Sequence, residues 1–442
     1  MDEPKTEAAQ AIENWSWLRK HIVLIQCSSY AVAPGFTSSI LIPAINEVAQ
    51  QFKVPAQTAT YLVAVHVLFL GISPFVWIPC MNTYGRRPVL IASLSLSCLA
   101  ALGGGFAKSY GGLMAARVFQ SFGVSAGFVL PGVIVVDLFK TEELGRKNGV
   151  WAQMVAIGAP LGGVIGGPVV YYLGWRWTLW ITSIANAVQT IGFVLTCPET
   201  SDSHRRNGVG TLKMRQFVEP FLILQSPHIV LVAFAYGVTF AVTSVGLASI
   251  VPLAFEERYG LGTIDQGLIF LGPLIGVLLG ERLAGPGSDW VMNRERRRCS
   301  TADSERLEIR LWIALPGFLL AILGVLIFGL TLQYSTHWIA PCIGFAISNF
   351  GLQLVTTPVK TYCVDCLKSH SGSVLQFINT VRQIIAFTVP FWSPNLNARL
   401  DYGLGFGIEA IILAVFSLGC LVVLWKGFGW RKVVHVKGLV DV

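Results

Sequence analysis

Charged side chains are scarce in this sequence. Only 13% of its 442 residues are Asp, Glu, Lys or Arg, whereas 53% are hydrophobic. Water-soluble domains carry about 25% charged residues, so the composition excludes an ordinary soluble globular protein. The apolar residues come in runs of about 20, the length that a helix needs to cross a hydrocarbon core of about 30 Å. Because lipid offers no partners to loose backbone groups, these runs must be helices.

Motifs for chemical catalysis are missing as well. The sequence has no H-E-x-x-H and no Gly-rich nucleotide-binding loop with its lysine, and a membrane enzyme or an ATP-driven pump would need such a cluster. We therefore expect neither an enzyme nor direct use of ATP. Cys363 and Cys366 form a C-x-x-C with only His370 near them, which is too few ligands for a zinc site. We expect no metal.

The apolar runs number twelve and are joined mostly by short connections, so consecutive helices should be antiparallel. A long polar segment, 198–227, divides them six and six, the layout of an internal duplication. The predicted fold is an all-α polytopic membrane protein built from two pseudo-symmetric six-helix bundles, 22–197 and 228–427, with tails 1–21 and 428–442. The runs span about 22–46, 58–80, 89–107, 113–138, 148–172, 176–197, 228–252, 264–283, 311–332, 337–359, 371–393 and 404–426.

Basic residues set the predicted orientation. With both termini cytoplasmic, 25 of the 32 Lys and Arg fall on inner segments and five on outer loops, as the positive-inside rule requires. The net charge of +8 therefore reflects topology, and we expect no nucleic-acid partner. The five outer residues are Lys53, Lys108, Arg176, Arg258 and Arg399.

The predicted cytoplasmic turn between the second and third helices reads IPCMNTYGRRPVL. Gly85 permits a tight backbone, and Arg86 and Arg87 hold the turn at the cytoplasmic face, so a simple topology anchor is one interpretation. The stretch also resembles the loop motif of the major facilitator superfamily. In that family an aspartate at the position of Asn82 helps to latch the two halves together. The resemblance extends to a weakened second copy, GERLAGPGSDWVMNRERRR, which contains Asp289, and to the turn after helix 4, which contains Asp137.

Helix 5 and the start of helix 6 read GAPLGGVIGGPVVYYLGWRWTLWI. Small residues let membrane helices approach closely, so close packing is one interpretation. The spacing also resembles the antiporter motif of the drug:proton antiporter group, with Gly163 in place of its proline. In that group the helix bends against its counterpart in the second half, limits leak and favours exchange. The residues concerned are Gly158, Pro160, Gly162, Gly163, Gly166, Gly167 and Pro168.

Arg117 lies inside predicted helix 4, where insertion of an arginine costs about 2.5–3.5 kcal/mol. With Gln120 it resembles the family's R-x-x-q-G motif, whose arginine is associated with proton coupling; the alternative is a hydrogen-bonded structural arginine. His66 is the only histidine well inside a predicted helix, and a histidine titrates near neutral pH. It is either a second proton carrier or a buried neutral histidine bonded to a carbonyl.

The resemblance also implies a cavity between the two halves, lined mainly by helices 1, 4, 7 and 10. Helices 1, 2, 4 and 5 contain no deep Asp or Glu, which favours neutral or weakly acidic, fairly apolar cargo. We expect Arg382 in helix 11 to pair with Asp365 or a loop acid. The candidate lining residues, each of which has packing as its alternative, are Tyr30, Phe36, Gln120, Tyr236, Asn349 and Gln353.

The sequence as a whole thus resembles the fungal twelve-helix drug:proton antiporters. The resemblance implies proton-driven export of a drug, toxin or secondary metabolite by alternating access, without a cofactor. The expected partners are the small-molecule substrate, protons and the lipid bilayer, for a monomer in the plasma membrane. A nutrient or organic-acid importer coupled to protons would share this fold, and a transporter-like sensor is a further alternative.

Overall fold

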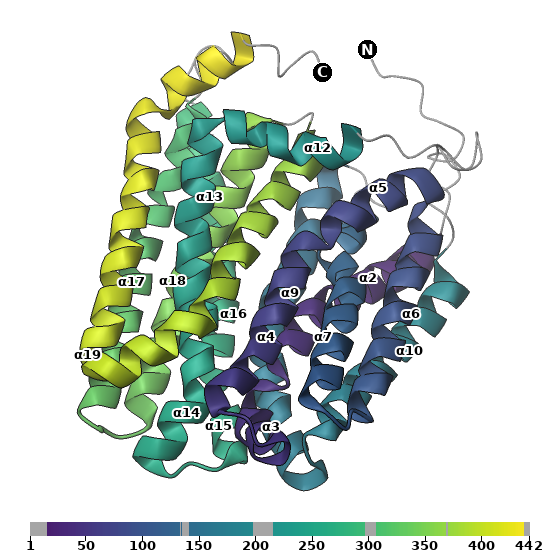
Figure 1. Cartoon of the computed structure of the whole chain (residues 1–442). Coiled ribbons are helices and arrows are strands. Elements are labelled where there is room, and N and C mark those ends of the chain that lie inside the picture. Colours follow the sequence, from purple (N-terminus) through teal and green to yellow (C-terminus); the bar gives the residue numbers. More distant parts are fainter. Residues whose placement is uncertain are drawn as a thin grey trace. The chain divides into compact units, whose positions relative to one another are not determined.

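A computed structural model describes residues 16–132, 134, 141–197, 215–296, 306–367 and 370–436. Within these residues all regular structure is helical (Figure 1), which confirms the predicted all-α class. The chain forms two compact units. Unit 1 contains residues 1–54 and 65–217, and unit 2 contains residues 55–64 and 218–442.

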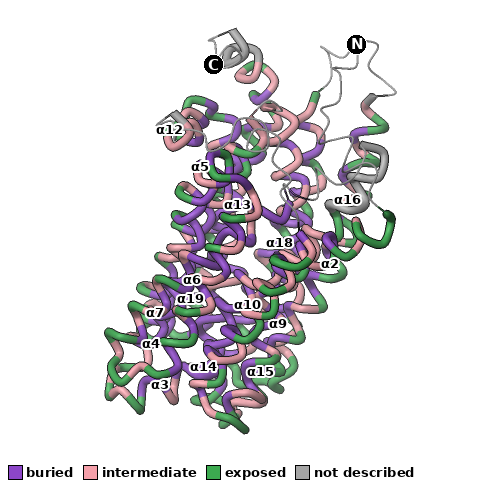
Figure 2. The backbone as a smooth tube through the Cα atoms, turned by 90° about the vertical axis from the view of Figure 1, so that its right-hand side faces the viewer, coloured by how far each residue is buried: buried purple, intermediate pink, exposed green. Residues whose placement is uncertain are grey.

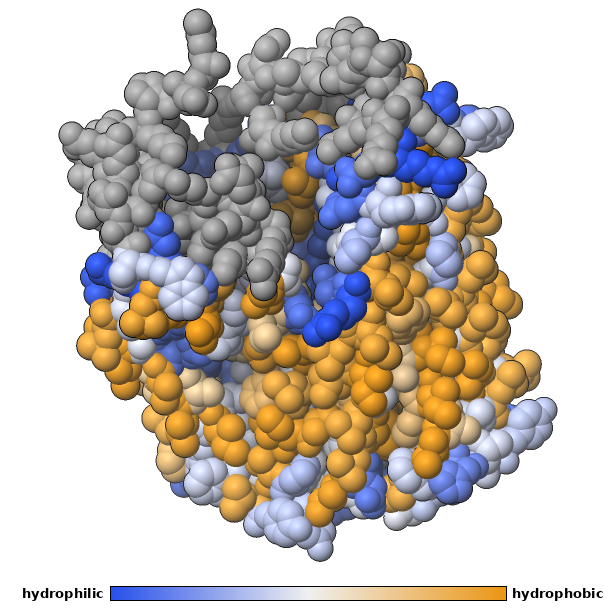
Figure 3. Space-filling view, turned by 180° about the vertical axis from the view of Figure 1, so that it is seen from behind, coloured by the Kyte–Doolittle hydropathy of each residue, from blue (hydrophilic) through white to orange (hydrophobic). Residues whose placement is uncertain are grey.

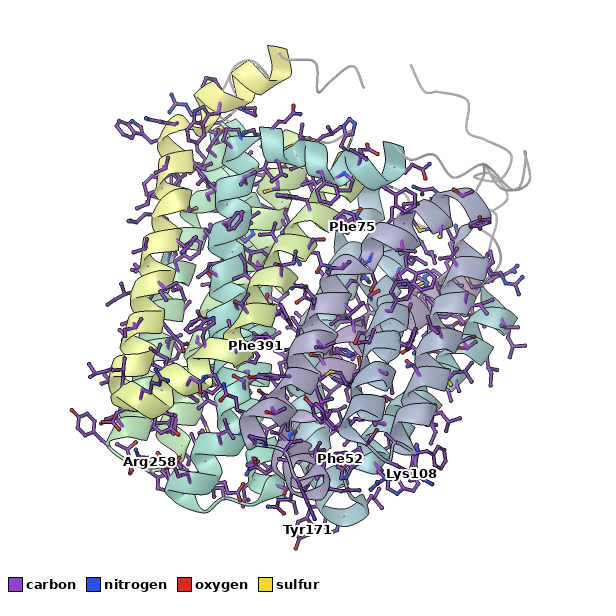
Figure 4. The ribbon with its side chains drawn as sticks, in the orientation of Figure 1. Phe52, Phe75, Lys108, Tyr171, Arg258 and Phe391 are labelled. Carbon is purple, nitrogen blue, oxygen red and sulfur yellow. The ribbon has the colours of Figure 1, made fainter. Side chains whose placement is uncertain are left out.

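The elements of the first half follow one another with short connections. They are α2 (Trp17–Ser39), η1 (Ile42–Ala44), α3 (Ile45–Phe52), α4 (Ala56–Ile72), α5 (Pro74–Tyr84), α6 (Arg86–Gly105), α7 (Tyr110–Val124), η2 (Ser125–Phe128), α9 (Thr141–Leu173) and α10 (Arg176–Thr196). Phe52, Lys108 and Tyr171, which lie at or near the turns that follow α3, α6 and α9, so that another connection of the chain comes between each two of them, are found at the same end of the unit 1 helices (Figure 4). This is what helices that alternate in direction require.

The second half continues with further helices and short helical turns. They are α12 (Arg215–Leu222), η3 (Ile223–Gln225), α13 (Pro227–Phe240), the π-helical turn η4 (Ala241–Gly246), α14 (Leu247–Tyr259), α15 (Thr263–Ile269), α16 (Leu271–Arg296), η6 (Leu307–Trp312), α17 (Ala314–Gln333), α18 (Ile339–Cys366) and α19 (Ser371–Val436). Asp401 has a left-handed backbone, with φ of 64°, and divides α19 into two helices.

Ten stretches of the described chain are long and apolar enough to cross a membrane. One of them, Ser371–Arg431, contains both helices of α19, and the 23-residue helix α2 precedes them all. Each of the twelve predicted apolar runs therefore has a helical counterpart.

The first helix differs from its predicted bounds at both ends. It begins at Trp17 because the Ser16 side chain accepts a hydrogen bond from the Arg19 backbone N–H at 3.3 Å, which satisfies one of the free amides of the first turn. It ends at Ser39, and Pro43 then starts the 3-10 turn η1. The prediction of one helix over 22–46 was wrong beyond residue 39, since hydropathy alone does not register these local signals.

Aromatic rings form the centre of unit 2. The Phe328 ring of α17 lies 5.2 Å from Phe406 of α19, 5.9 Å from Phe345 of α18 and 6.1 Å from Phe255 of α14. All four side chains are buried, and each such pair adds about 0.5–1.5 kcal/mol beyond its buried area. This cluster fixes four helices of unit 2 around one ring. Figure 2 shows the buried positions of the chain in purple, along α14, α18 and α19 among other helices.

Large apolar side chains also cover outward faces. Leu195, Leu319 and Trp425 are 77%, 63% and 83% exposed, and Figure 3 shows apolar side chains over much of the face seen there. Soluble monomers rarely expose contiguous apolar patches of this kind. These faces are suited to lipid, in agreement with an integral, multi-pass membrane protein.

Candidate functional site

A polar network is buried inside unit 1, with the intramembrane arginine at its centre. Arg117 of α7 is 0% exposed. Its Nη1 donates to the carbonyl oxygen of Thr37 in α2 at 2.9 Å and to Oε1 of Gln120 at 2.9 Å. Gln120 in turn donates through Nε2 to the hydroxyl of Thr182 in α10 at 3.1 Å. The network thus connects three helices, and it brings together two of the residues that the sequence singled out.

His66 of α4 joins the same network through two hydroxyl groups. Its Nε2 lies 3.1 Å from Oγ1 of Thr37, and its Nδ1 lies 2.5 Å from Oγ of Ser121. The Ser121 hydroxyl is also 2.5 Å from the carbonyl oxygen of Arg117, to which it donates. His66 and Arg117, the two candidates for proton coupling, therefore both contact Thr37, and their roles in coupling stay predictions.

The two hydroxyl groups accommodate either charge state of the imidazole. When the ring is neutral with its proton on Nδ1, Ser121 accepts from Nδ1–H and Thr37 donates to Nε2. When the ring is protonated, Thr37 accepts from Nε2–H and turns its own hydrogen to the carbonyl oxygen of Ala33, 2.8 Å away. Only a hydroxyl rotation separates the two arrangements. His66 also interacts with the backbone of Pro34, so a buried neutral histidine bonded to a carbonyl stays an alternative.

The two aromatic candidates of helix 1 lie apart from this network. Tyr30 is fully buried, its hydroxyl is 3.3 Å from Oγ of Ser93 in α6, and its ring meets the edge of Phe193 in α10 at 6.0 Å. We assign Tyr30 to packing among α2, α6 and α10. Phe36 is half-buried, and its carbonyl oxygen faces Gly162 of α9. Its role as a lining residue stays a prediction.

Three glycines of the helix 5 motif pack directly on the backbone of α2. A Cβ at Gly162 would lie 2.5 Å from the carbonyl oxygen of Phe36, closer than side chains are found. The same contact repeats at every fourth residue of both helices, which gives a seam of backbone against backbone. The pairs are Gly158 with Val32, Gly162 with Phe36 and Gly166 with Ile40. Close packing within unit 1 therefore accounts for these three residues.

The remaining residues of that motif lie in α9 as well. Gly163 and Gly167 are buried, Pro160 is buried and Pro168 is half-buried. Their role in exchange, which the resemblance implied, stays a prediction.

The loop motif forms the turn between α5 and α6. Gly85 has φ 93° and ψ 162°, a backbone that only glycine adopts without strain. Asn82 is exposed on the last turn of α5. Arg86 starts α6, and Arg87 donates through Nη2 to the carbonyl oxygen of Val194 in α10 at 2.6 Å. In this structure Arg87 thus also ties two helices of unit 1 together.

The second copy of the loop motif holds an ion-pair cluster. Arg310 lies 3.3 Å from Oδ1 of Asp289 and 2.9 Å from Oδ2 of Asp365, and it donates to Oγ of Ser288 at 3.1 Å. Asp289 itself is largely exposed, whereas Arg310 is buried. These contacts join α16, η6 and α18. Asp137, the acid of the other predicted turn, lies outside the described residues.

Arg382 has different partners from those expected. Its Nη1 donates to the hydroxyl of Tyr236 at 3.1 Å and its Nη2 to Oδ1 of Asn379 at 2.8 Å. The guanidinium also lies 4.4 Å from the centre of the Phe240 ring, within the range of a cation–π contact. Of the two kinds of partner expected for Arg382, Asp365 pairs with Arg310 instead, and a pair with a loop acid stays a prediction. Tyr236 is instead the residue that connects α13 to the first part of α19.

The two remaining lining candidates are buried on α18. Asn349 donates through Nδ2 to the carbonyl oxygens of Phe345, at 3.0 Å, and of Thr243 in η4, at 3.3 Å. Gln353 packs with its Cβ against Gly280 of α16. Asn349 therefore connects α18 to the π-helical turn. A lining role for either stays a prediction.

Two acids in the membrane helices of unit 2 escaped the sequence analysis. Glu281 accepts hydrogen bonds from the Thr357 hydroxyl at 3.1 and 3.2 Å, so it belongs to the packing of α16 and α18. Glu409 of α19 is 0% exposed. Each of these acids lies within or near the end of a predicted apolar run. An acid at such a position is expensive, so its presence alone indicates a functional or structural role.

Comparisons with known proteins agree with this architecture. The sequence profile described as "Major Facilitator Superfamily" matches residues 29–390. A probable efflux pump of Aspergillus flavus, mfs2, is 26% identical over 88% of this chain and 97% of its own length. The MFS-type transporter penM of Penicillium rubens is 24% identical over 95% and 86%. The crystal structure of the human organic anion transporter MFSD10 (TETRAN) superposes with a TM-score of 0.63 at 16% identity, over 91% of this chain and 99% of that one.

The helical membrane fold and the match across most of the chain lead to one conclusion. The chain is a multi-pass membrane transporter, and it belongs to the Major Facilitator Superfamily.

Proposed function

We propose that this transporter exports small, fairly apolar organic molecules, neutral or weakly acidic, in exchange for protons. The observation that carries the proposal is the buried network around Arg117 and His66. The four helices that build it, α2, α4, α7 and α10, contain no Asp or Glu. The guanidinium therefore sets a positive local field, which disfavours organic cations and tolerates neutral or anionic groups.

The same network offers a way to couple protons to movement. A proton on His66 places a second positive charge beside Arg117, and the two residues are linked both through Thr37 and through Ser121. Like charges at this separation inside a protein repel strongly. Protonation would thus strain the contact of α7 with α2, and release of the proton would restore it. Such a charge-dependent contact is a suitable trigger for the rocking of two halves around a central site.

The proton gradient supplies enough free energy for export without any cofactor. One elementary charge that moves across 100 mV releases about 2.3 kcal/mol, which corresponds to about a 50-fold concentration ratio of cargo. The similarity to a probable efflux pump of Aspergillus flavus supports the outward direction. We propose a monomer in the plasma membrane with both termini in the cytoplasm.

The first experiment deletes the gene in its own host and compares small molecules inside the cells and in the medium by mass spectrometry. A compound that accumulates inside and falls outside identifies the cargo and supports export. A compound that stays unused in the medium would reverse the direction to import and overturn the proposal.

The role of Arg117 is tested with the cargo so identified. We expect Arg117→Gln to abolish export that is sensitive to a protonophore. Lys108→Gln is the matched control, because it removes one positive charge from an exposed position of the same unit. Full protonophore-sensitive export by Arg117→Gln would contradict the coupling role of this arginine.

A further inference from the structure

Glu409 is a buried carboxyl group that the proposed function does not use. It lies eight residues beyond the break at Asp401, in the second helix of α19, which places it about 12 Å into that helix. Its side chain is 0% exposed. An ionised acid at the centre of a membrane helix costs about 2.5–3.5 kcal/mol, so this carboxyl group needs either good partners or a proton.

The hydrogen-bond donors around Glu409 bind only one of its two carboxyl oxygens. Oε1 accepts a hydrogen bond from the Ser393 hydroxyl at 2.6 Å and another from Nδ2 of Asn397 at 3.3 Å. Both donors stand on the first helix of α19, on the other side of the break. Oε2 is buried and has no hydrogen-bond partner among the described residues. A carboxylate has about four acceptor positions, so the ionised form would leave half of its charge without a donor.

A hydrogen-bond acceptor lies close to Oε2, the oxygen of Glu409 that receives no hydrogen bond. A Cβ built on Gly246, the last residue of η4, would lie 3.4 Å from Oε2 of Glu409 and also 3.4 Å from the carbonyl oxygen of Ala241. Oε2 and that carbonyl therefore border the same position. If Oε2 carried a proton it would become a donor, and the Ala241 carbonyl would be its acceptor, directly or through one water molecule. π-Helical turns of this kind are frequent at functional sites.

Among the described residues, no charged group pairs with this carboxyl group. The turn η4 and helix α17, which pack on α19, contain no Asp, Glu, Lys, Arg or His. The hydrogen bonds of Glu409 run to Ser393 and Asn397, and the described titratable groups of α13 and α14 and those beside the break form no ion pair or hydrogen bond with it. Those closest to Gly246 or to the break along the chain are Tyr236, Glu256, Glu257, Arg399, Asp401 and Tyr402.

We propose that Glu409 is a proton-binding site inside unit 2, at which the bound proton ties α19 to the π-helical turn η4. In the protonated state Oε2–H donates toward the Ala241 carbonyl, while Oε1 keeps the Ser393 and Asn397 contacts. When the proton leaves, this hydrogen bond is lost, and a carboxylate with donors on only one of its oxygens faces η4. The use of this site as a second proton carrier rests on the proposed function. That Glu409 binds a proton does not depend on the proposed function.

Infrared difference spectroscopy of the full chain in lipid nanodiscs tests this site with the proton itself as the probe. We expect a carbonyl-stretch band of a protonated carboxylic acid at neutral pH, its loss when the buffer is made alkaline, and its absence in Glu409→Gln. Asp265→Asn, which alters an exposed acid of the same unit, should keep the band. Coinciding spectra of the wild type and Glu409→Gln, or a band that no pH change removes, would overturn the proposal.

A second variant covers the case in which Glu409→Gln does not fold. Gly246→Ala keeps the carboxyl group and adds a methyl group at an ordinary contact distance, 3.4 Å from Oε2. This variant should shift the frequency of the Glu409 band and leave the bands of all other acids unchanged. An unshifted Glu409 band would count against the assignment. If the band titrates but export does not depend on the proton gradient, the proposed function fails and the proton site stands.

Discussion

The seam between α9 and α2 allows a quantitative prediction for Gly162→Ala. The new Cβ would lie 2.5 Å from the carbonyl oxygen of Phe36 and 3.1 Å from the backbone nitrogen of Ile40. Both are backbone atoms, so no side-chain rotation can relieve the contact. An ordinary contact begins at 3.4 Å, so the two helices would have to separate by about 0.9 Å in an interior packed as densely as a crystal.

The cost of that separation is that of an overpacked core, about 1–3 kcal/mol. For a chain of this kind each kcal/mol lowers the melting temperature by about 2–4 °C, so Gly162→Ala should melt about 2–12 °C below the wild type. The same substitution at Gly149, in the same helix, is the control, because no atom lies within 4 Å of the Cβ it adds. Since alanine favours a helix over glycine by about 1 kcal/mol, Gly149→Ala should melt at or above the wild-type temperature.

The measurement is the loss of the monodisperse peak of detergent-purified protein after heating, read as an apparent melting temperature because membrane proteins rarely refold. Equal melting temperatures for Gly162→Ala and Gly149→Ala would refute the reasoning, since they would show that the seam has room for a methyl group.

Two further predictions concern the turns. Gly85→Ala places a side chain at φ 93°, ψ 162°, which should cost about 1–3 kcal/mol and lower the melting temperature in the same assay; an unchanged value would mean that the turn relaxes freely. Arg310→Met leaves the Asp365 carboxylate without its partner at 2.9 Å. Breaking a buried ion pair lowers the stability of a protein by about 3–5 kcal/mol, and we expect a smaller loss here because the Asp365 side chain is 20% exposed. Adding Asp365→Asn should recover part of the loss, and additive losses in this double-mutant cycle would contradict the pairing.

The membrane helices could be predicted from sequence because their signal is local. Twenty apolar residues in a row suffice to define a span, and Gly85 between two such runs suffices to define a turn. The close approach at Gly162 was also foreseeable as an alternative, since small residues at a spacing of four mark one helix face. The partner helix of this seam, α2, was not foreseeable, because small residues mark a helix face without identifying the element that packs on it.

The polar contacts could not be read from sequence because they depend on how helices are rotated against one another. His66 and Ser121 stand 55 residues apart, and one helical residue of rotation, about 100°, would separate them. For the same reason Arg382 was given Asp365 as a partner, although the structure supplies Tyr236. Glu409 was overlooked because its donors lie on another helix, and only the sharp break at Asp401 brings the two helices back to one another.

The seam of α9 and α2 also has a consequence for how such a chain can diversify. On the α2 side the contact is made by carbonyl oxygens, which every amino acid supplies alike. The exception is Gly35, whose added Cβ would lie 2.7 Å from the backbone nitrogen of Ala159. Side chains at Val32, Phe36 and Ile40, which meet the glycines of α9 through their carbonyl oxygens, can change, and with them the molecules that helix 1 recognises, while the spacing of the two helices is inherited unchanged.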